Sequence, residues 1–245
     1  MQIEITYIFH NCFIVRFPGK TGYTRTFLFD YPADEFLDEA RRAAVISMIR
    51  DTELYLFSSH NHHDHFNRNS MNLKAYTKSL TCILSKDIVK NNRMYRESPS
   101  CYKVNAGQSY AIHDFTLDTF RSNDAGVAFL IHLGALNIYF GGDLANWDWD
   151  DNTIEERRFL VEYFGEVLQK LKREPIHIAF SNTDQRLPNW AGAAQFIRTV
   201  KPGLFVPMHT FGETQAIGGF LSENPNLGCK VFQYRETGDT VKLEV

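Results

Sequence analysis

Alternation of apolar and polar residues marks the first third of the chain as rich in β-strands. Runs of this kind, with many β-branched and aromatic side chains, are typical of half-buried strands. The pattern predicts strands at residues 3–10, 12–17, 26–29 and 54–58, and another around residues 81–84. Residues 34–49 have a helical composition and Pro32 stands just ahead of them, which predicts a helix between the third and fourth strands.

The rest of the chain begins with consecutive strands and ends with strands that alternate with helices. Strands are predicted at residues 110–112, 115–120, 127–133 and 136–140, with Gly134-Ala135 closing a tight hairpin between the last two. Thr153-Ile154-Glu155-Glu156 matches a capping box, and an apolar helical stripe follows at Leu160, Phe164, Leu168 and Leu171. Further helices are predicted at residues 190–200 and 213–221, and further strands at 176–180, 204–206, 231–234 and 240–244.

This order of elements predicts an α+β fold. Several strands come first and strand–helix alternation follows, in both halves of the chain. That order suits two mixed β-sheets packed face to face with helices on the outer faces. No internal repeat, low-complexity tract or Pro/Gly/Ser-rich linker interrupts the sequence. We therefore expect residues 1–245 to form a single domain.

Composition and charge narrow the class of protein and of partner. The chain has 245 residues, 44% hydrophobic and 22% charged, as expected for a globular protein with a sizeable core. A formal net charge of −3 and the lack of a basic clamp count against nucleic acid as a partner. The longest nearly apolar run, residues 127–140, is too short and too polar to span a bilayer, so we expect no membrane association.

The cysteines and the N-terminus indicate the cellular compartment. Cys12, Cys82, Cys101 and Cys229 are widely scattered, with no CxxC pair. The N-terminus lacks a basic segment followed by an apolar one, which is the pattern of a signal peptide. Both observations favour reduced thiols in a cytoplasmic protein. Nothing in the sequence specifies an oligomeric state.

The candidate chemistry concentrates in His60-Asn61-His62-His63-Asp64-His65, which follows an apolar run. Three other apolar runs also lead to a residue able to bind metal or to support a ligand, namely Asp30, Asp143 and His209. Loops beyond strand ends are where such proteins collect functional side chains. Imidazole and carboxylate are ligands of zinc and other first-row divalent ions. The pattern therefore predicts a site that holds one or two metal ions and activates water.

The motif His60-x-His62-x-Asp64-His65, with Gly142-Asp143 and His209 downstream, resembles the metallo-β-lactamase-fold hydrolase superfamily over essentially the whole chain. The resemblance implies an αβ/βα four-layer sandwich with a dinuclear site at one edge. It also implies roles for the individual residues. His60 and His62 bind the first ion, Asp64, His65 and His209 bind the second, and Asp143 bridges the two. Asp30 binds no metal but orders the ligands around the site. His63 stands at a variable motif position and is not an expected ligand.

One loop departs from the family's commonest pattern. The first metal usually takes a third histidine from a loop before a Gly-Val-type strand, and here that loop reads Arg121-Ser122-Asn123-Asp124-Ala125. Asp124 is the best substitute, and Ser122 or Asn123 the next. The alternative for Asp124 is a carboxylate hydrogen-bonded to backbone within the turn. An oxygen ligand at this place would shift the metal preference towards harder ions such as Mn²⁺.

The resemblance implies a metal-dependent hydrolase in which metal-activated hydroxide attacks an ester, lactone, thioester or phosphodiester-type small-molecule substrate. Asp64 and Asp143 are the candidate catalytic residues, as acceptors of the proton. The expected cofactor is Zn²⁺, as two ions, with Mn²⁺ or Fe as alternatives. A second hypothesis is a non-catalytic or mononuclear metal-binding protein, a sensor or partner-binding module on the same fold, and the altered loop at Asp124 motivates it.

Three more side chains have open roles. Trp147 and Trp149 follow Asp143 closely. They either wall a substrate pocket or pack their loop onto the next helix. Arg186 either holds an anionic group of a substrate or pairs with Asp184.

Overall fold

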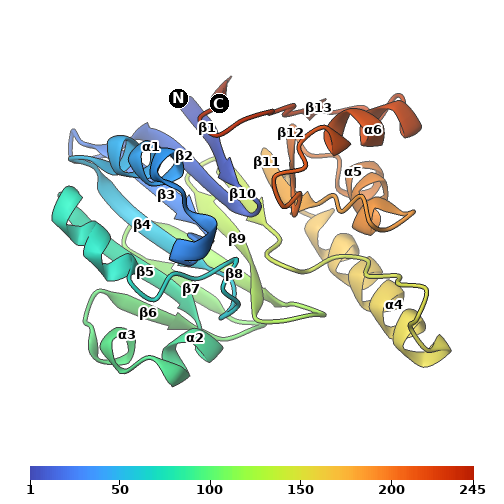
Figure 1. Ribbon diagram of the computed structural model, residues 1–245, viewed down its shortest axis with the longest axis horizontal. Helices are drawn as coiled ribbons and strands as arrows, with labels where there is room; N and C mark the ends of the chain where they lie inside the picture. Colours follow the sequence, from blue (N-terminus) through green and yellow to red (C-terminus); the bar gives the residue numbers. More distant parts are fainter. The chain divides into compact units, whose positions relative to one another are not determined.

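The computed structural model describes residues 1–245 apart from the side chain of residue 91, and its contacts divide the chain into two compact units. The first unit consists of Met1–Asn105 together with Tyr234–Val245, and the second of Ala106–Gln233. The chain thus leaves the first unit once and returns to it at its end (Figure 1). The single domain expected for residues 1–245 stays a prediction. Among the described residues, no helix is long and apolar enough to cross a membrane.

The first unit is built on a mixed seven-stranded sheet in the order β14-β1-β2-β3-β4-β5-β6. Its strands are β1 (Gln2–Phe9), β2 (Cys12–Pro18), β3 (Thr24–Phe29), β4 (Glu53–Ser58), β5 (Ser79–Ser85), β6 (Cys101–Val104) and β14 (Thr240–Glu244). Neighbours from β14 to β3 pair antiparallel, and those from β3 to β6 pair parallel. Parallel neighbours need crossover connections, which contain η1 (Asp34–Phe36), α1 (Glu39–Ile49), η2 (Ser70–Tyr76), α2 (Lys86–Asn91) and α3 (Arg93–Glu97).

The two faces of this sheet bury different side chains. Successive side chains of a strand point to opposite faces, so β3 contributes to both. Leu28 lies in an apolar cluster with Val45 and Ile49 of α1. Phe27 and Phe29 lie on the other face, fully buried, with ring centroids 6.3 Å apart in an edge-on arrangement. The strand predicted at residues 26–29 is therefore buried on both faces and ends directly at Asp30.

The second unit has its own mixed seven-stranded sheet, in the order β13-β12-β11-β10-β9-β8-β7. Its strands are β7 (Ser109–Ile112), β8 (Phe115–Arg121), β9 (Val127–Leu133), β10 (Leu136–Phe140), β11 (Ile178–Asn182), β12 (Leu204–Met208) and β13 (Lys230–Val231). Its helical segments are α4 (Ile154–Leu171), η3 (Trp190–Gly192), α5 (Ala193–Val200) and α6 (Ala216–Glu223). The hairpin expected at Gly134-Ala135 is confirmed, because Leu133 pairs with Leu136 and Gly134 has a φ of +61°.

Helix α4 packs on this sheet through most of its predicted apolar stripe. Phe164, Leu168 and Leu171 are buried in one cluster with Tyr139 of β10. Leu160, one turn earlier, is only half-buried and packs against a separate small cluster that includes Ala145 and Trp147 of the loop after β10. The stripe therefore anchors the helix, and its first member borders the loop that follows Phe140.

Both sheets are mixed and both units carry helices, which confirms the α+β fold class. Some boundaries differ from the sequence prediction. Helix α1 begins at Glu39 rather than at residue 34, because the Asp38 side chain caps it by accepting a hydrogen bond from the Arg41 backbone N–H. The strand expected at residues 231–234 is confined to Lys230–Val231. Strand β6 was not predicted, since it spans only four residues with little alternation.

The capping box at the start of α4 is present and gives the first testable prediction. Thr153 Oγ1 accepts a hydrogen bond from the Glu156 backbone N–H (3.1 Å), and the Glu156 carboxylate accepts one from the Thr153 backbone N–H (2.9 Å). Replacing Thr153 with Ala should lower the free energy of unfolding by about 1 kcal/mol. Thr153→Ser keeps the hydroxyl and should stay within about 0.5 kcal/mol of the parent in urea unfolding. Equal losses in the two variants would contradict the assignment.

The same box predicts a pH dependence. The hydrogen bonds from Thr153 hold the pKa of the Glu156 carboxyl below its usual value. A carboxyl with a lowered pKa in the folded chain stabilises the fold above its unfolded pKa of about 4.3 and loses that effect as the pH falls through the lowered value. The difference in unfolding midpoint between Thr153→Ser and Thr153→Ala should therefore be constant near pH 7 and shrink in acid. A difference that grows in acid would refute this.

Candidate metal-binding site

In the first unit, the Asp30 carboxylate organises the histidine-rich loop. Asp30 follows β3 directly, is fully buried, and has a positive φ of 40°. Its two oxygens accept hydrogen bonds from the backbone N–H and the hydroxyl of Ser59, both at 2.7 Å, and Oδ2 also lies 2.8 Å from His65 Nδ1. Burial raises the pKa of Asp30 well above its usual value, and the Ser59 hydrogen bonds act in the opposite direction. Asp30 thus links the start and the end of the 60–65 turn.

His60 and His62 come together within this loop. His60 is buried, and its Nδ1 lies 2.9 Å from the Ser59 hydroxyl that Asp30 also binds. Its Nε2 lies 2.9 Å from Nδ1 of His62, which is exposed. His63 is also exposed, but its Nδ1 lies 3.1 Å from the Glu35 carboxylate at the surface. The loop therefore brings His60 and His62 together and directs His63 towards Glu35 instead.

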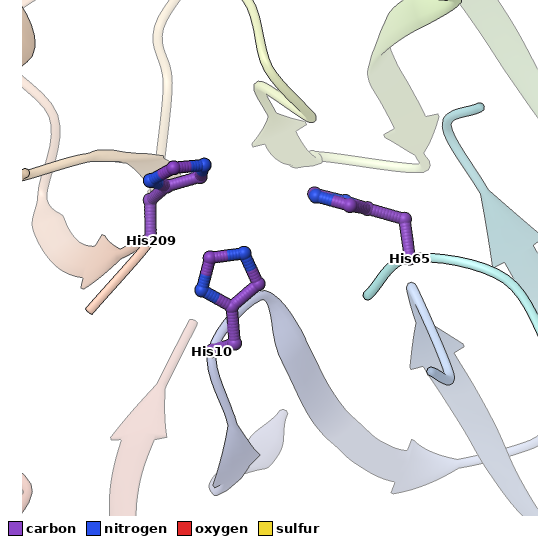
Figure 2. Close-up of side chains that lie close together, drawn as sticks. All are labelled: His10, His65 and His209. Carbon is purple, nitrogen blue, oxygen red and sulfur yellow. The ribbon is translucent and has the colours of Figure 1, made fainter. Parts of the chain in front are cut away.

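Asp64 and His65 form a second group of ligand atoms in the same unit, together with His10. Asp64 Oδ2 lies 3.6 Å from His65 Nε2 and 3.4 Å from His10 Nε2. His10 follows β1, and its ring approaches the His65 ring edge-on, with centroids 5.3 Å apart (Figure 2). Partial burial alone would raise the pKa of Asp64, but the hydrogen bond from His10 and the nearby His65 lower it. His10 is not among the ligands predicted from the sequence, which favours a structural histidine near the site, since early strands of the resembling fold approach it.

In the second unit, Asp143 and His209 lie at the ends of two strands of one sheet. Asp143 follows β10 after Gly141 and Gly142, and His209 follows β12. His209 Nε2 lies 3.8 Å from Asp143 Oδ1, and both side chains are largely buried. A Cβ at Gly141 would meet the Phe180 carbonyl oxygen at 3.3 Å, and Gly142 has a positive φ of 50°. The two glycines therefore allow the turn that places Asp143 beside His209.

Asp184 supports His209, and sequence reasoning missed this contact. Asp184 follows β11, the neighbour of β12 in the sheet, and its Oδ2 lies 3.0 Å from His209 Nδ1. The carboxylate also accepts hydrogen bonds from Arg186 Nε at 2.9 and 3.1 Å, which confirms the Asp184–Arg186 pair. Burial would raise the pKa of Asp184, but the hydrogen bonds from His209 and Arg186 lower it. The signal for this role was the position of Asp184 just past a strand adjacent to that of His209.

The loop that lacks the usual histidine places Asp124 near Asp143. The side chain of Asn123 donates to the Ala145 carbonyl oxygen (2.7 Å) and accepts from the Ala145 backbone N–H (3.2 Å), which ties this loop to the loop of Asp143. Carboxylate oxygens of Asp124 and Asp143 come within 4.8 Å of each other. The Asp124 backbone N–H donates to the Ser122 hydroxyl (3.1 Å), so Ser122 stabilises the turn.

Comparison with known proteins identifies the architecture. No protein-family model and no curated protein matches the chain. The structure is similar to that of Igni18, a metallo hydrolase from the archaeon Ignicoccus hospitalis, with a TM-score of 0.64, 15% identity and all of both chains covered. It is also similar to the metallo-β-lactamase fold protein YhfI from Bacillus subtilis, with a TM-score of 0.63, 11% identity, and 98% of this chain and 99% of that one covered. This chain has the metallo-β-lactamase fold. The architecture implied by the sequence motif is thereby confirmed.

The fold by itself leaves the reaction open. CmlA, a diiron β-hydroxylase from Streptomyces venezuelae, has a similar structure over 98% of this chain and 54% of its own, with a TM-score of 0.57 and 12% identity. A hydroxylase and a hydrolase are thus both similar in structure to this chain, so function has to be argued from the site.

The Asp184–His209 contact gives a prediction about metal affinity. Carboxylates that hold the second nitrogen of a ligating histidine typically contribute about 10- to 100-fold to metal affinity. Asp184→Ala should therefore weaken Zn²⁺ binding by about that factor in a chelator competition. Asp118→Ala is the matched control, because it removes an equivalent carboxylate 3.1 Å from the unrelated His132. Unchanged Zn²⁺ affinity in Asp184→Ala, or an equal loss in Asp118→Ala, would contradict the role given to Asp184.

Proposed function

We propose that the chain is a metal-dependent hydrolase of small-molecule esters, lactones, thioesters or phosphodiesters. One observation carries the proposal: each unit presents a histidine whose Nδ1 is held by a buried aspartate. These pairs are His65 with Asp30 (2.8 Å) and His209 with Asp184 (3.0 Å). A carboxylate on Nδ1 fixes the ring orientation and the tautomer, which leaves Nε2 for a metal ion. In both histidines, Nε2 lies within 4 Å of a further carboxylate oxygen, from Asp64 or Asp143.

The ligand set proposed from the sequence motif fits these donors. His60 and His62 of the first unit would hold one ion, with Asp124 of the second unit in place of the usual histidine. Asp64, His65 and His209 would hold the other ion, and Asp143 would contribute to both. Imidazole nitrogens and carboxylate oxygens are the donors that Zn²⁺ uses in catalytic sites, so Zn²⁺ is the proposed ion, with Mn²⁺ or Fe as alternatives.

Two divalent cations at this site would lower the pKa of a water molecule towards neutrality, so that hydroxide is present for attack near pH 7. The chain's own residues supply the remaining requirements. His10 and His65 keep the pKa of Asp64 low, so this side chain is a carboxylate at neutral pH. A carboxylate is the form that can accept a proton from the attacking water, and Asp143 is the second candidate for that step. Asp30 and Asp184 hold the histidine rings in position throughout.

A second candidate function is a non-catalytic or mononuclear metal-binding protein, acting as a sensor or a partner-binding module. The loop at Asn123 and Asp124 favours it, because an aspartate stands where a third imidazole would complete the first metal's ligands. In that case the ion bound by Asp64, His65 and His209 would be present alone. The metal content of the purified chain distinguishes the two candidates.

The hydrolase proposal is tested with His62→Ala, Asp143→Ala and the control His63→Ala. The first two variants remove proposed ligands and should lose at least one metal ion per chain and roughly a hundredfold or more of the hydrolytic rate. His63→Ala should keep both, because His63 faces Glu35 at the surface. Metal content is measured by mass spectrometry, and activity on a panel of chromogenic esters, lactones and phosphodiesters. Full metal content and full activity in His62→Ala or Asp143→Ala would refute the proposal.

Asp124 is tested separately by metal stoichiometry. Asp124→Ala should bind one ion where the parent chain binds two, because the first ion loses a ligand. Asp124→His supplies an imidazole at the same place and should bind two ions, with a preference for Zn²⁺ over Mn²⁺ at least as strong as in the parent. Two tightly bound ions in Asp124→Ala would show that Asp124 is a turn residue and not a ligand.

A further inference from the structure

A cavity of about 330 Å³ lies within the second unit, beside two of the proposed metal ligands. Its lining residues are Asn123, Asp124, Trp147, Trp149, Leu160, Arg186 and His209. This volume is at the lower end of the range for small-molecule sites, which is about 300–1,000 Å³. Because Asp124 and His209 form part of the wall, a ligand in this cavity would have its reacting group next to the proposed metal site.

One wall of the cavity is a rigid apolar surface. Trp147 and Trp149 lie parallel, with an interplanar angle of 3° and centroids 6.2 Å apart. Trp147 Nε1 donates to the Asp143 carbonyl oxygen (2.8 Å), which fixes its ring. The carbonyl oxygens of Trp147 and Trp149 accept hydrogen bonds from Asn152 (2.7 Å) and Arg157 (3.1 Å). The two tryptophans therefore pack their loop against the start of α4 and also line this cavity.

Arg186 lies beside Trp149 in the lining of the cavity, and Asp184 fixes the position of its side chain. The Arg186 guanidinium carbon lies 5.3 Å from the Trp149 ring centroid and 4.9 Å from that of Phe211. Asp184 binds Arg186 through Nε and Nη2, so the Nη1 edge of the guanidinium takes no part in that pair. The Arg186 side chain is 52% exposed, while that of Asp184 is 2% exposed. An arginine fixed on one edge and open on another is pre-organised to bind a carboxylate.

We propose that this cavity binds the non-reacting part of the substrate, and that this part is a flat apolar group carrying a carboxylate. Trp149, Trp147 and Leu160 contact the apolar group, and Arg186 donates hydrogen bonds to the carboxylate. Asp124 also lines the cavity, and its negative charge is compensated when it binds metal, so the inference rests on the proposed function. Within the substrate classes above, it selects esters, lactones and thioesters whose non-reacting part is aromatic or similarly planar and carries a separate free carboxylate.

The test is a binding measurement with phenylacetate and phenylacetamide, which have the same shape and differ in charge. Binding is followed by quenching of tryptophan fluorescence in the full chain. A Trp190→Phe background confines the signal to Trp147 and Trp149, because the chain has three tryptophans. The parent should bind phenylacetate at least tenfold more tightly than phenylacetamide, and Arg186→Gln should reduce that preference to threefold or less. Arg186→Lys keeps the charge and should retain part of the preference.

Two control variants test whether the preference for phenylacetate belongs to this cavity. Arg158→Gln removes an exposed arginine that pairs with Glu162 on α4, and should leave the phenylacetate preference unchanged. Trp149→Ala should weaken both probes to a similar extent, since it removes the apolar contact and not the cation. A preference that survives in Arg186→Gln but disappears after chelation would mean that the metal, and not Arg186, binds the carboxylate, and would overturn the inference. Failure of both probes to bind the parent chain would overturn it as well.

The outcomes also separate this inference from the hydrolase proposal. An active, metal-loaded hydrolase without an Arg186-dependent preference would refute the subsite alone. A chain that shows this preference but hydrolyses no compound of the panel would refute the hydrolase and leave the binding site standing.

Discussion

The buried carboxyl group of Asp30 positions the histidine-rich loop of the candidate site. A carboxylate that is fully removed from water is costly unless hydrogen bonds compensate it. Here the compensation comes from the backbone and hydroxyl of Ser59 and from His65 Nδ1, all within 2.8 Å. The Ser59 hydroxyl in turn lies 2.9 Å from His60 Nδ1. The need to satisfy the oxygens of one buried carboxyl group therefore fixes the positions of the first and the last histidine of the 60–65 motif.

The second unit has a similar arrangement, in which the buried carboxylate of Asp184 contacts Nδ1 of His209. This carboxylate is 2% exposed and is satisfied by His209 and Arg186, so it orients a proposed ligand and a proposed substrate-binding cation together. A change at Asp184 would consequently alter metal affinity and substrate recognition at once. Because carboxylate-braced histidines are a recurrent arrangement around catalytic metals, two of them in one chain support a metal-dependent reaction more strongly than the histidine count does.

Much of the fold could be predicted from the sequence, because it depends on local apolar patterns. The strand that leads to Asp30 and the capping box at Thr153 are both where the pattern placed them. Local patterns did not predict the short strand β6. They also placed the start of α1 too early, because the helix begins where the Asp38 side chain caps it. The His60–His65 motif predicted a loop rich in metal ligands, and the structure brings His60 and His62 of this loop together. The contacts that His10 makes with Asp64 and that Asp184 makes with His209 were not predicted, because they depend on which strands lie side by side. The positions of His10 and Asp184 just past strands were the local signals that pointed towards the site.

The proposed chemistry requires that ligands from both units bind the same pair of metal ions. Anomalous diffraction at the absorption edge of the bound metal, from a crystal of the metal-loaded chain, locates those ions without reference to activity. We expect two peaks about 3.5–4 Å apart, with Asp143 bridging them, His60 and His62 on one ion, and His65 and His209 on the other. Metal ions ligated by the residues of one unit alone, or no ordered ion at Asp143, would contradict this arrangement.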